Sequence, residues 1–286
     1  MPALALVRLS RPHFLIGGAL FYAIGVASAG SITVRDYLLG QFAVSAAQLT
    51  AHYVNEYHDL EADRLVLHRT LFSGGSGVLI EWAGGRRFAL TAAKVTTAIT
   101  FALSVGLALV SPLAALLTIL ALSVSWLYSA PPVRLLGSGL GELTTSLVVT
   151  IVVPLVGVGV AGGGADPGLW WLVAPLLMIH LAMMLAFELP DHESDHRAGK
   201  HVLAVRVGVG RTVFLIGGLF VGSAIVLLIG IVTGALPGWL WMGLGLALVG
   251  GTAVVVAAHR ARYPALTATA VATLASVGTT GLIGLS

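Results

Sequence analysis

Residues 55–64 read Asn-Glu-Tyr-His-Asp-Leu-Glu-Ala-Asp-Arg and end an apolar run that begins near residue 37. The stretch holds four carboxylates in a chain that is 57% hydrophobic and only 9% charged. If the preceding helix continues through it, Asn55, Asp59 and Asp63 lie about one turn apart on one side. The spacing therefore predicts a row of oxygen ligands at the end of a helix.

A second acidic stretch follows another apolar run. Residues 188–195 read Glu-Leu-Pro-Asp-His-Glu-Ser-Asp, so Asp191 and Asp195 are again four residues apart. Ionisable clusters in or beside a membrane are functional far more often than acidic loops of soluble proteins. We therefore expect a bundle that brings the two stretches together into one site.

The composition predicts an all-α, polytopic membrane protein. Soluble domains carry about 25% charged residues, far more than this chain. The chain has no cysteine, which excludes disulfides and thiolate metal sites. We expect a lipid bilayer around the protein and no nucleic-acid partner. A bundle of about nine spans, each near the ~20 residues that a bilayer needs, is predicted at 13–33, 37–55, 91–110, 113–130, 140–161, 170–189, 212–233, 238–258 and 264–285.

The basic residues predict the orientation of this bundle. With the N-terminus in the cytoplasm, every Lys and Arg except Arg35 lies on the cytoplasmic side, as the positive-inside rule requires. Both acidic stretches then face the cytoplasm, which predicts a protein of the cytoplasmic (inner) membrane with its active site on that side. The first apolar run, with Ala27-Ser28-Ala29, imitates a signal peptide. It is long enough to span, so we expect it to be retained.

We expect residues 1–286 to form a single transmembrane domain with two cytoplasmic loops. The loop over 55–90 carries the first acidic stretch, and the loop over 188–211 carries the second. Residues 72–77, Phe-Ser-Gly-Gly-Ser-Gly, have the composition of a flexible linker. Beside a charged site, such a run also suits a lid. The segments after residue 212 contain little polar chemistry and are expected to be scaffold.

Carboxylates beside an asparagine amide are hard oxygen ligands that suit Mg²⁺, which commonly bridges one or two carboxylates to a phosphate. Zinc is disfavoured beside these hard oxygen ligands, although residues 192–196, His-Glu-Ser-Asp-His, have the HExxH spacing. Basic residues beside the acids would neutralise such a phosphate, and the apolar bundle suits a lipid tail. The neighbouring basic residues are Arg64, Arg69, Lys94, Arg197 and Lys200.

Four segments in order resemble the UbiA superfamily of membrane prenyltransferases. Residues 55–63 resemble its NDxxDxxxD motif, and residues 191–195 its second aspartate motif. Residues 128–134, Tyr-Ser-Ala-Pro-Pro-Val-Arg, are similar to its YSxPPxR segment. Residues 195–208 and 72–79 resemble the branch that prenylates 1,4-dihydroxy-2-naphthoate for menaquinone. The chain departs from the family at Glu56, where the family usually has Asp, and at His201-Val202, where it usually has Arg-Thr.

The resemblance implies an Mg²⁺-dependent enzyme that transfers an isoprenyl group from an isoprenyl diphosphate to an aromatic acceptor. Two ions would bind the diphosphate, and loss of diphosphate would leave an allylic cation that the aromatic ring attacks. The implied metal ligands are Asn55, Glu56, Asp59, Asp63, Asp191 and Asp195. The implied catalytic residues are Asp59, Asp63, Asp191, Asp195 and Tyr128, and the substrate-binding residues are Arg11, Arg64, Arg69, Lys94, Arg134, Arg197 and Lys200.

Several of these assignments have plain alternatives. Arg11 and Tyr128 also suit anchors at the membrane interface, and Lys94 also suits a side chain that snorkels to the surface. The acceptor is expected to be a naphthoate or another quinone precursor, while a lipid glycerophosphate, haem or a chlorin would use the same donor site. A divalent-cation transporter is the alternative from another class, although transporters place their sites near the bilayer midplane. A scaffold protein with surface acids is a third.

Overall fold

The structure is a computed structural model that describes residues 2–66, 69–261 and 263–283. All regular elements in these ranges are helical. The chain folds as two compact units, one of Met1–Arg69 and Gly74–Ala165, the other of Thr70–Ser73 and Asp166–Ser286. Each acidic stretch thus belongs to its own unit. The expectation of one domain over 1–286 stays a prediction.

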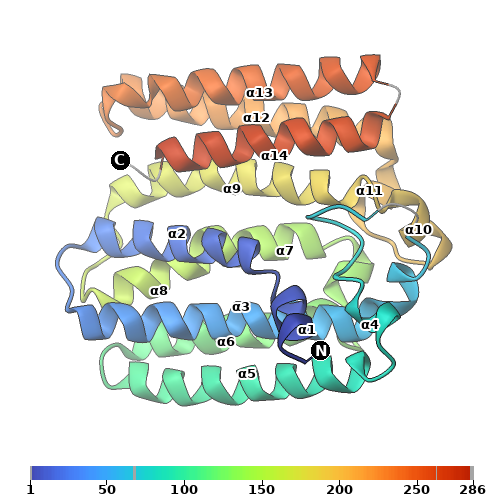
Figure 1. The fold of residues 1–286 in the computed structure, drawn as a ribbon. Coiled ribbons are helices and arrows are strands. Elements are labelled where there is room, and N and C mark those ends of the chain that lie inside the picture. Colours follow the sequence, from blue (N-terminus) through green and yellow to red (C-terminus); the bar gives the residue numbers. More distant parts are fainter. Residues whose placement is uncertain (1, 67–68, 262, 284–286) are drawn as a thin grey trace. The chain divides into compact units, whose positions relative to one another are not determined.

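The first unit is built around α3, which packs against α2, α5 and α6 (Figure 1). Helix α8 in turn contacts α2 and α6. Short elements precede or connect these long helices. The elements are α1 (Pro2–Ser10), α2 (Pro12–Ala29), α3 (Val34–Asp63), α4 (Val78–Glu81), α5 (Gly85–Ala108), α6 (Pro112–Ser129), η1 (Leu135–Ser138), α7 (Gly141–Leu147), η2 (Val148–Val152) and α8 (Val153–Val160).

The second unit places α9 against both α12 and α14, while α13 packs against α12 and α14 (Figure 1). Two short helices, α10 and α11, connect α9 to α12. The elements are α9 (Pro167–Glu188), α10 (His192–Arg197), α11 (Leu203–Val207), α12 (Val209–Val232), η3 (Gly238–Leu240), α13 (Trp241–Arg260) and α14 (Pro264–Ile283).

The predicted apolar segments all coincide with long helical stretches of the described chain. By length and composition, seven stretches of these residues are able to cross a membrane, and α3 and α14 are not among them. The apolar part of α3 carries Gln41, Gln48 and His52, which lower its hydropathy. The all-helical class is confirmed, while the count of nine spans and the cytoplasmic N-terminus stay predictions. The seven stretches are Pro12–Ala29, Gly85–Ala108, Pro112–Ser129, Gly141–Val160, Pro167–Glu188, Val209–Val232 and Gly238–Arg260.

Helix α3 continues through the first acidic stretch, as the spacing predicts. It begins after Thr33, whose hydroxyl accepts a hydrogen bond from Asp36 N at 3.1 Å. Such a cap satisfies one of the orphan donors of the first turn. The helix ends only at Asp63, so its 30 residues extend well past residue 55. Asn55, Asp59 and Asp63 therefore share one side of a continuous helix.

The second acidic stretch is divided between two helices. Helix α9 ends at Glu188, two residues before Pro190, which lacks the backbone N–H that a continuing helix needs. The chain restarts as α10, with Asp191 at its N-cap and Asp195 inside it. Asp195 N donates to Asp191 O at 2.8 Å, which sets these two residues one turn apart.

Candidate functional site

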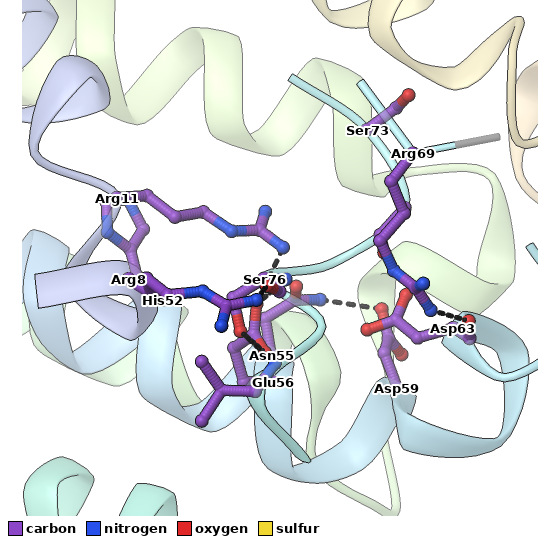
Figure 2. Close-up of polar contacts among 12 residues, drawn as sticks. Arg8, Arg11, His52, Asn55, Glu56, Asp59, Asp63, Arg69, Ser73 and Ser76 are labelled. Carbon is purple, nitrogen blue, oxygen red and sulfur yellow. Dashed lines mark hydrogen bonds and ion pairs between the residues drawn. The ribbon is translucent and has the colours of Figure 1, made fainter. Parts of the chain in front are cut away.

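Asn55 and Asp59 are joined on the polar side of α3. Asn55 Nδ2 donates to Asp59 Oδ2 at 2.7 Å and to Ser129 Oγ, at the end of α6, at 3.2 Å (Figure 2). Asp59 is only 7% exposed. Two contacts from one amide group thus fix the orientation of the Asn55 side chain and the position of the Asp59 carboxylate.

The Asp63 carboxylate lies against the backbone of Gly75. A Cβ on Gly75 would stand 2.0 Å from Asp63 Oδ2, and Gly75 has a φ of 68°, which side chains disfavour. Arg69 binds the same turn, since its Nη2 donates to Asp63 O at 2.7 Å and its Nε to Gly74 O at 2.8 Å (Figure 2). Glycine is therefore required where the loop closes over Asp63.

Glu56 faces a different set of partners from its neighbour Asn55. Its side chain is 2% exposed, and Arg11 Nη2 donates to Oε1 at 2.6 Å (Figure 2). Ser76 N also donates to Oε1 and Ser76 Oγ donates to Oε2, both at 2.7 Å. Both carboxylate oxygens thus bind protein donors. Metal binding by Glu56 stays a prediction from the sequence.

The junction of α1 and α2 is fastened to α3 at several points. Arg11 has a φ of 43°, which is uncommon for a residue with a side chain. Ser10 O lies 2.8 Å from His52 Nδ1, and Ser10 Oγ lies 2.6 Å from Tyr53 Oη. The guanidinium of Arg11 is thereby directed to Glu56, whereas the sequence suggested a phosphate contact or an interface anchor for it.

The second acidic stretch is held by charges close in sequence. Asp195 is 7% exposed and pairs with Lys200, with 3.3 Å between Nζ and Oδ1. Asp191 O accepts from Ser194 Oγ at 2.8 Å as well as from Asp195 N. Arg197 pairs with exposed Glu193 one turn earlier on α10. Lys200 thus lies beside Asp195, a predicted metal ligand. Arg197 instead pairs with Glu193, which is exposed to solvent.

The other predicted substrate-binding cations lie at exposed positions. Arg64 pairs with exposed Glu61 at 3.1 Å. Lys94 is exposed on α5, and Arg134 is exposed with a φ of 46°. Tyr128 is half-buried near the end of α6. The position of Lys94 is compatible with snorkelling, and the assigned roles of all four residues stay predictions.

Several residues of this region had no role assigned from sequence. Ser76 and Gly75 were visible only as part of a Gly/Ser run, and Arg8 only as a basic residue before the first span. In the structure Arg8 Nη2 donates to Ser76 O at 2.8 Å and to Glu81 Oε1 at 2.8 Å. The sequence signal that points to Arg8 is its spacing. It lies three residues before Arg11, which is the distance between neighbours on one helix face.

Two side chains beyond the predicted end of the second span have shifted pKa values. Burial lowers the pKa of His58, and the Arg134 guanidinium lowers it further. The neighbouring Asp59 carboxylate acts in the opposite direction and raises it. The hydrogen bond from Arg8 lowers the pKa of Glu81, so this carboxylate stays ionised well below neutral pH.

The described residues contain no group of three or more His, Cys, Asp or Glu side chains with the arrangement of a metal site. Mg²⁺ does not need such a cage, because it keeps several waters and is usually held by one or two carboxylates together with substrate phosphate. The Asn55 amide and the carboxylates of Asp59 and Asp63 supply suitable oxygens on one side of α3. The donor set of the first unit thus fits Mg²⁺ held jointly with a phosphate.

The long apolar helices indicate an integral membrane protein, with buried acidic residues at the ends of α3 and α9. The family model for the UbiA prenyltransferase family matches residues 15–277. The chain belongs to this family, and it is a prenyltransferase. No sequence among the curated proteins matches this chain.

Solved structures of a UbiA homologue and of a digeranylgeranylglyceryl phosphate synthase share this fold. A UbiA homologue from Archaeoglobus fulgidus bound to DMAPP and Mg²⁺ is 18% identical, with a TM-score of 0.70 over 98% of this chain and 97% of that one. Its complex with GPP and Mg²⁺ has a TM-score of 0.70 at 17% identity, over 98% of each chain. A digeranylgeranylglyceryl phosphate synthase has a TM-score of 0.67 at 17% identity, over 99% of this chain and 97% of that one.

Proposed function

We propose that this prenyltransferase moves an isoprenyl group from an isoprenyl diphosphate to an aromatic acceptor inside the membrane, with Mg²⁺. The observation that carries the proposal is the row of Asn55, Asp59 and Asp63 on α3, which offers oxygen ligands one turn apart. The Archaeoglobus structures with DMAPP or GPP and Mg²⁺ support the donor class and the metal.

The ligands proposed for two Mg²⁺ ions are Asn55, Asp59, Asp63, Asp191 and Asp195. Bound Mg²⁺ would neutralise the diphosphate and stabilise it as a leaving group. The protein's own task is to hold these oxygens in place, which the contacts of Asn55 with Asp59 and of Gly75 with Asp63 do in the first unit. Lys200 and Arg69 place positive charge beside these acids. Tyr128 is proposed to flank the allylic cation.

For the acceptor we propose a quinone precursor, with dihydroxynaphthoate first, because residues 195–208 and 72–79 resemble the naphthoate-prenylating branch. A lipid glycerophosphate is the second candidate, favoured by the likeness to digeranylgeranylglyceryl phosphate synthase. Haem or a chlorin as the acceptor is a further outcome that the assay has to separate. The proposed location is the cytoplasmic membrane with the site facing the cytoplasm, because nearly all basic residues lie on that side in the predicted topology.

The test is an assay of purified protein in detergent with Mg²⁺, a radiolabelled allylic diphosphate, and a panel of acceptors. The panel contains dihydroxynaphthoate, other aromatic acids and a glycerophosphate lipid. Transfer that is lost with EDTA and restored by Mg²⁺ is the expected result, and the labelled product identifies the acceptor. Diphosphate binding without transfer to aromatic acids would overturn the acceptor assignment. Absence of both binding and transfer would overturn the proposed function.

A further inference from the structure

Ser76 is held at each of its polar atoms. Its backbone N–H and its hydroxyl both donate to Glu56, and its carbonyl accepts from Arg8 Nη2 at 2.8 Å (Figure 2). Together with the hydrogen bond from Val78 N to Ser76 Oγ at 3.2 Å, these contacts fix a point of a loop that is otherwise rich in glycine. Because Gly74, Gly75 and Gly77 all have positive φ values, this loop would have many conformations without such an anchor.

The anchored residue lies next to the glycine that closes over Asp63. With Ser76 fixed, Gly75 is kept where its Cα faces the Asp63 carboxylate, with 2.0 Å between Oδ2 and the position a Cβ would take. We expect loss of the Ser76 anchor to let Gly75 shift relative to the Asp63 carboxylate, although Arg69 still binds Gly74 O. The contacts of Ser76 therefore bear on Asp63, although they do not touch it.

We propose that Glu56 is a positioning residue that acts through Ser76 and Gly75 on Asp63, and not a ligand of the metal. This inference rests on the proposed function, since it assigns a role within the same site. Glu56 is the shared partner in the arrangement, because it binds Ser76 from the loop and Arg11 from the α1–α2 junction. Arg8 completes it from α1.

The charges favour this role over metal binding. Glu56 and Arg11 form an ion pair whose side chains are 2% and 18% exposed. A metal would take the carboxylate from Arg11 and Ser76, and removal of one partner from a buried pair is strongly destabilising. Glu56 also lies about 100° around the helix from Asn55, so these two neighbouring side chains point in different directions.

The length of the side chain matters to the arrangement. Glutamate reaches Arg11 with one oxygen and Ser76 with both. Aspartate, which is usual at this position in the family that the chain resembles, is shorter by one C–C bond of about 1.5 Å. Glu56→Asp would therefore lose Ser76 or Arg11. The two roles predict opposite results, since a metal ligand should tolerate the family's own residue.

The first measurement is amide hydrogen exchange of the loop, with neither Mg²⁺ nor donor present. We expect the Ser76 amide to exchange about 10-fold faster in Glu56→Gln and Glu56→Asp, as for loss of a hydrogen bond of about 1.4 kcal/mol. Glu61→Gln, an exposed acid on the same helix, is the matched control and should leave exchange unchanged. Unchanged exchange in both Glu56 variants would overturn the proposal whatever reaction the protein catalyses.

The second measurement is a double-mutant cycle on transfer, with Ser76→Ala as the partner variant. Ser76→Ala keeps the backbone N–H and removes only the hydroxyl, so it should fold even if Glu56 variants do not. We expect Ser76→Ala and Glu56→Asp each to lower kcat/KM about 10-fold or more, because small displacements of catalytic groups are costly. The double variant should be no worse than the poorer single one. The positioning role would be overturned if the losses of kcat/KM from the two single variants multiply in the double variant. A wild-type kcat/KM in Glu56→Asp would also overturn it. A wild-type protein without any transfer would instead refute the proposed function and leave the exchange result standing.

Discussion

The two acidic stretches differ in where their partners come from. In the first unit, Glu56 binds Arg11 and Ser76, which lie 45 and 20 residues away, and Asn55 binds Ser129, 74 residues away. In the second unit, Asp195 and Glu193 pair with Lys200 and Arg197, all within α10 and the turn after it. These contacts of the first stretch come from distant segments of the chain, and these contacts of the second come from its own turn.

This difference predicts how the stretches respond to change. Geometry that depends on partners from three separate segments is lost when any of those segments shifts, since each contact contributes only about 1 kcal/mol. Geometry that depends on a single helical turn survives as long as the turn forms. We therefore expect the first stretch to be sensitive to substitutions in the loop and in α1, and the second to be sensitive to substitutions of its own acids and of Lys200.

The largest effect is expected from the acids themselves. Asp59→Ala and Asp191→Ala should each lower turnover by at least about 100-fold, the scale for loss of one group that stabilises developing charge. The thermal midpoint in detergent should shift by only a few degrees. Glu61→Gln and Glu193→Gln are matched controls, with exposed acids from the same two stretches. Near-normal turnover in Asp191→Ala would show that the second stretch is not part of the site.

Two glycines, one beside each acidic stretch, test whether the loop contact with Asp63 matters for activity. Gly75 in the first loop and Gly199 after α10 have φ values of 68° and 71°, so alanine at either costs about 1–2 kcal/mol of backbone strain. Only at Gly75 would the new methyl group overlap a carboxylate, because nothing lies within 4 Å of a Cβ on Gly199. Gly75→Ala should therefore lower kcat/KM by about 10- to 100-fold.

Gly199→Ala supplies the matched control for that experiment. It should lower the thermal midpoint by a similar amount but keep most of the transfer activity. Equal losses of activity in the two variants would mean that backbone strain, and not the contact with Asp63, accounts for the effect. The comparison is made at saturating Mg²⁺, so that weaker metal binding does not contribute.

Local features of this fold followed from the sequence, and the long-range ones did not. The continuation of α3 to Asp63 was predictable because the acids keep the spacing of a helical face. The break after Glu188 was predictable from Pro190. The contacts of Ser76 with Glu56 and Arg8 were not predictable, because a serine in a glycine-rich run has the composition of an ordinary linker. Arg11 and Glu56 each suggested contacts with substrate or metal, since no local pattern joins residues 45 positions apart.

Substitution of the cations Lys200 and Arg64 should change the KM for the diphosphate by less than the substitutions above change activity. Lys200 pairs with Asp195 where the side chains are 12% and 10% exposed, while Arg64 pairs with Glu61 at the surface. Lys200→Gln should raise the KM for the diphosphate about 10-fold, as for loss of a charge-assisted hydrogen bond of 1.5–3 kcal/mol. Arg64→Gln should change it less than about two-fold, because exposed ion pairs contribute 0–1 kcal/mol. Equal effects would place the phosphate near both cations.

The smallest effect is expected at the outer edge of the first stretch, where Glu81 binds Arg8. The pKa of Glu81 is lowered by this hydrogen bond, so the folded state binds its proton less readily than the unfolded state. The stabilisation is present above the unfolded pKa of 4.5 and is lost as the pH falls through the lower folded value. Glu81→Gln should therefore lower the thermal midpoint slightly at pH 7 and by less as the pH falls below 4.5. Arg8 would still donate to Ser76 O, so transfer activity should be retained. A large loss of activity at pH 7 would mean that Arg8 needs Glu81 to hold Ser76, and the long-range assembly of the first stretch would then extend to α4.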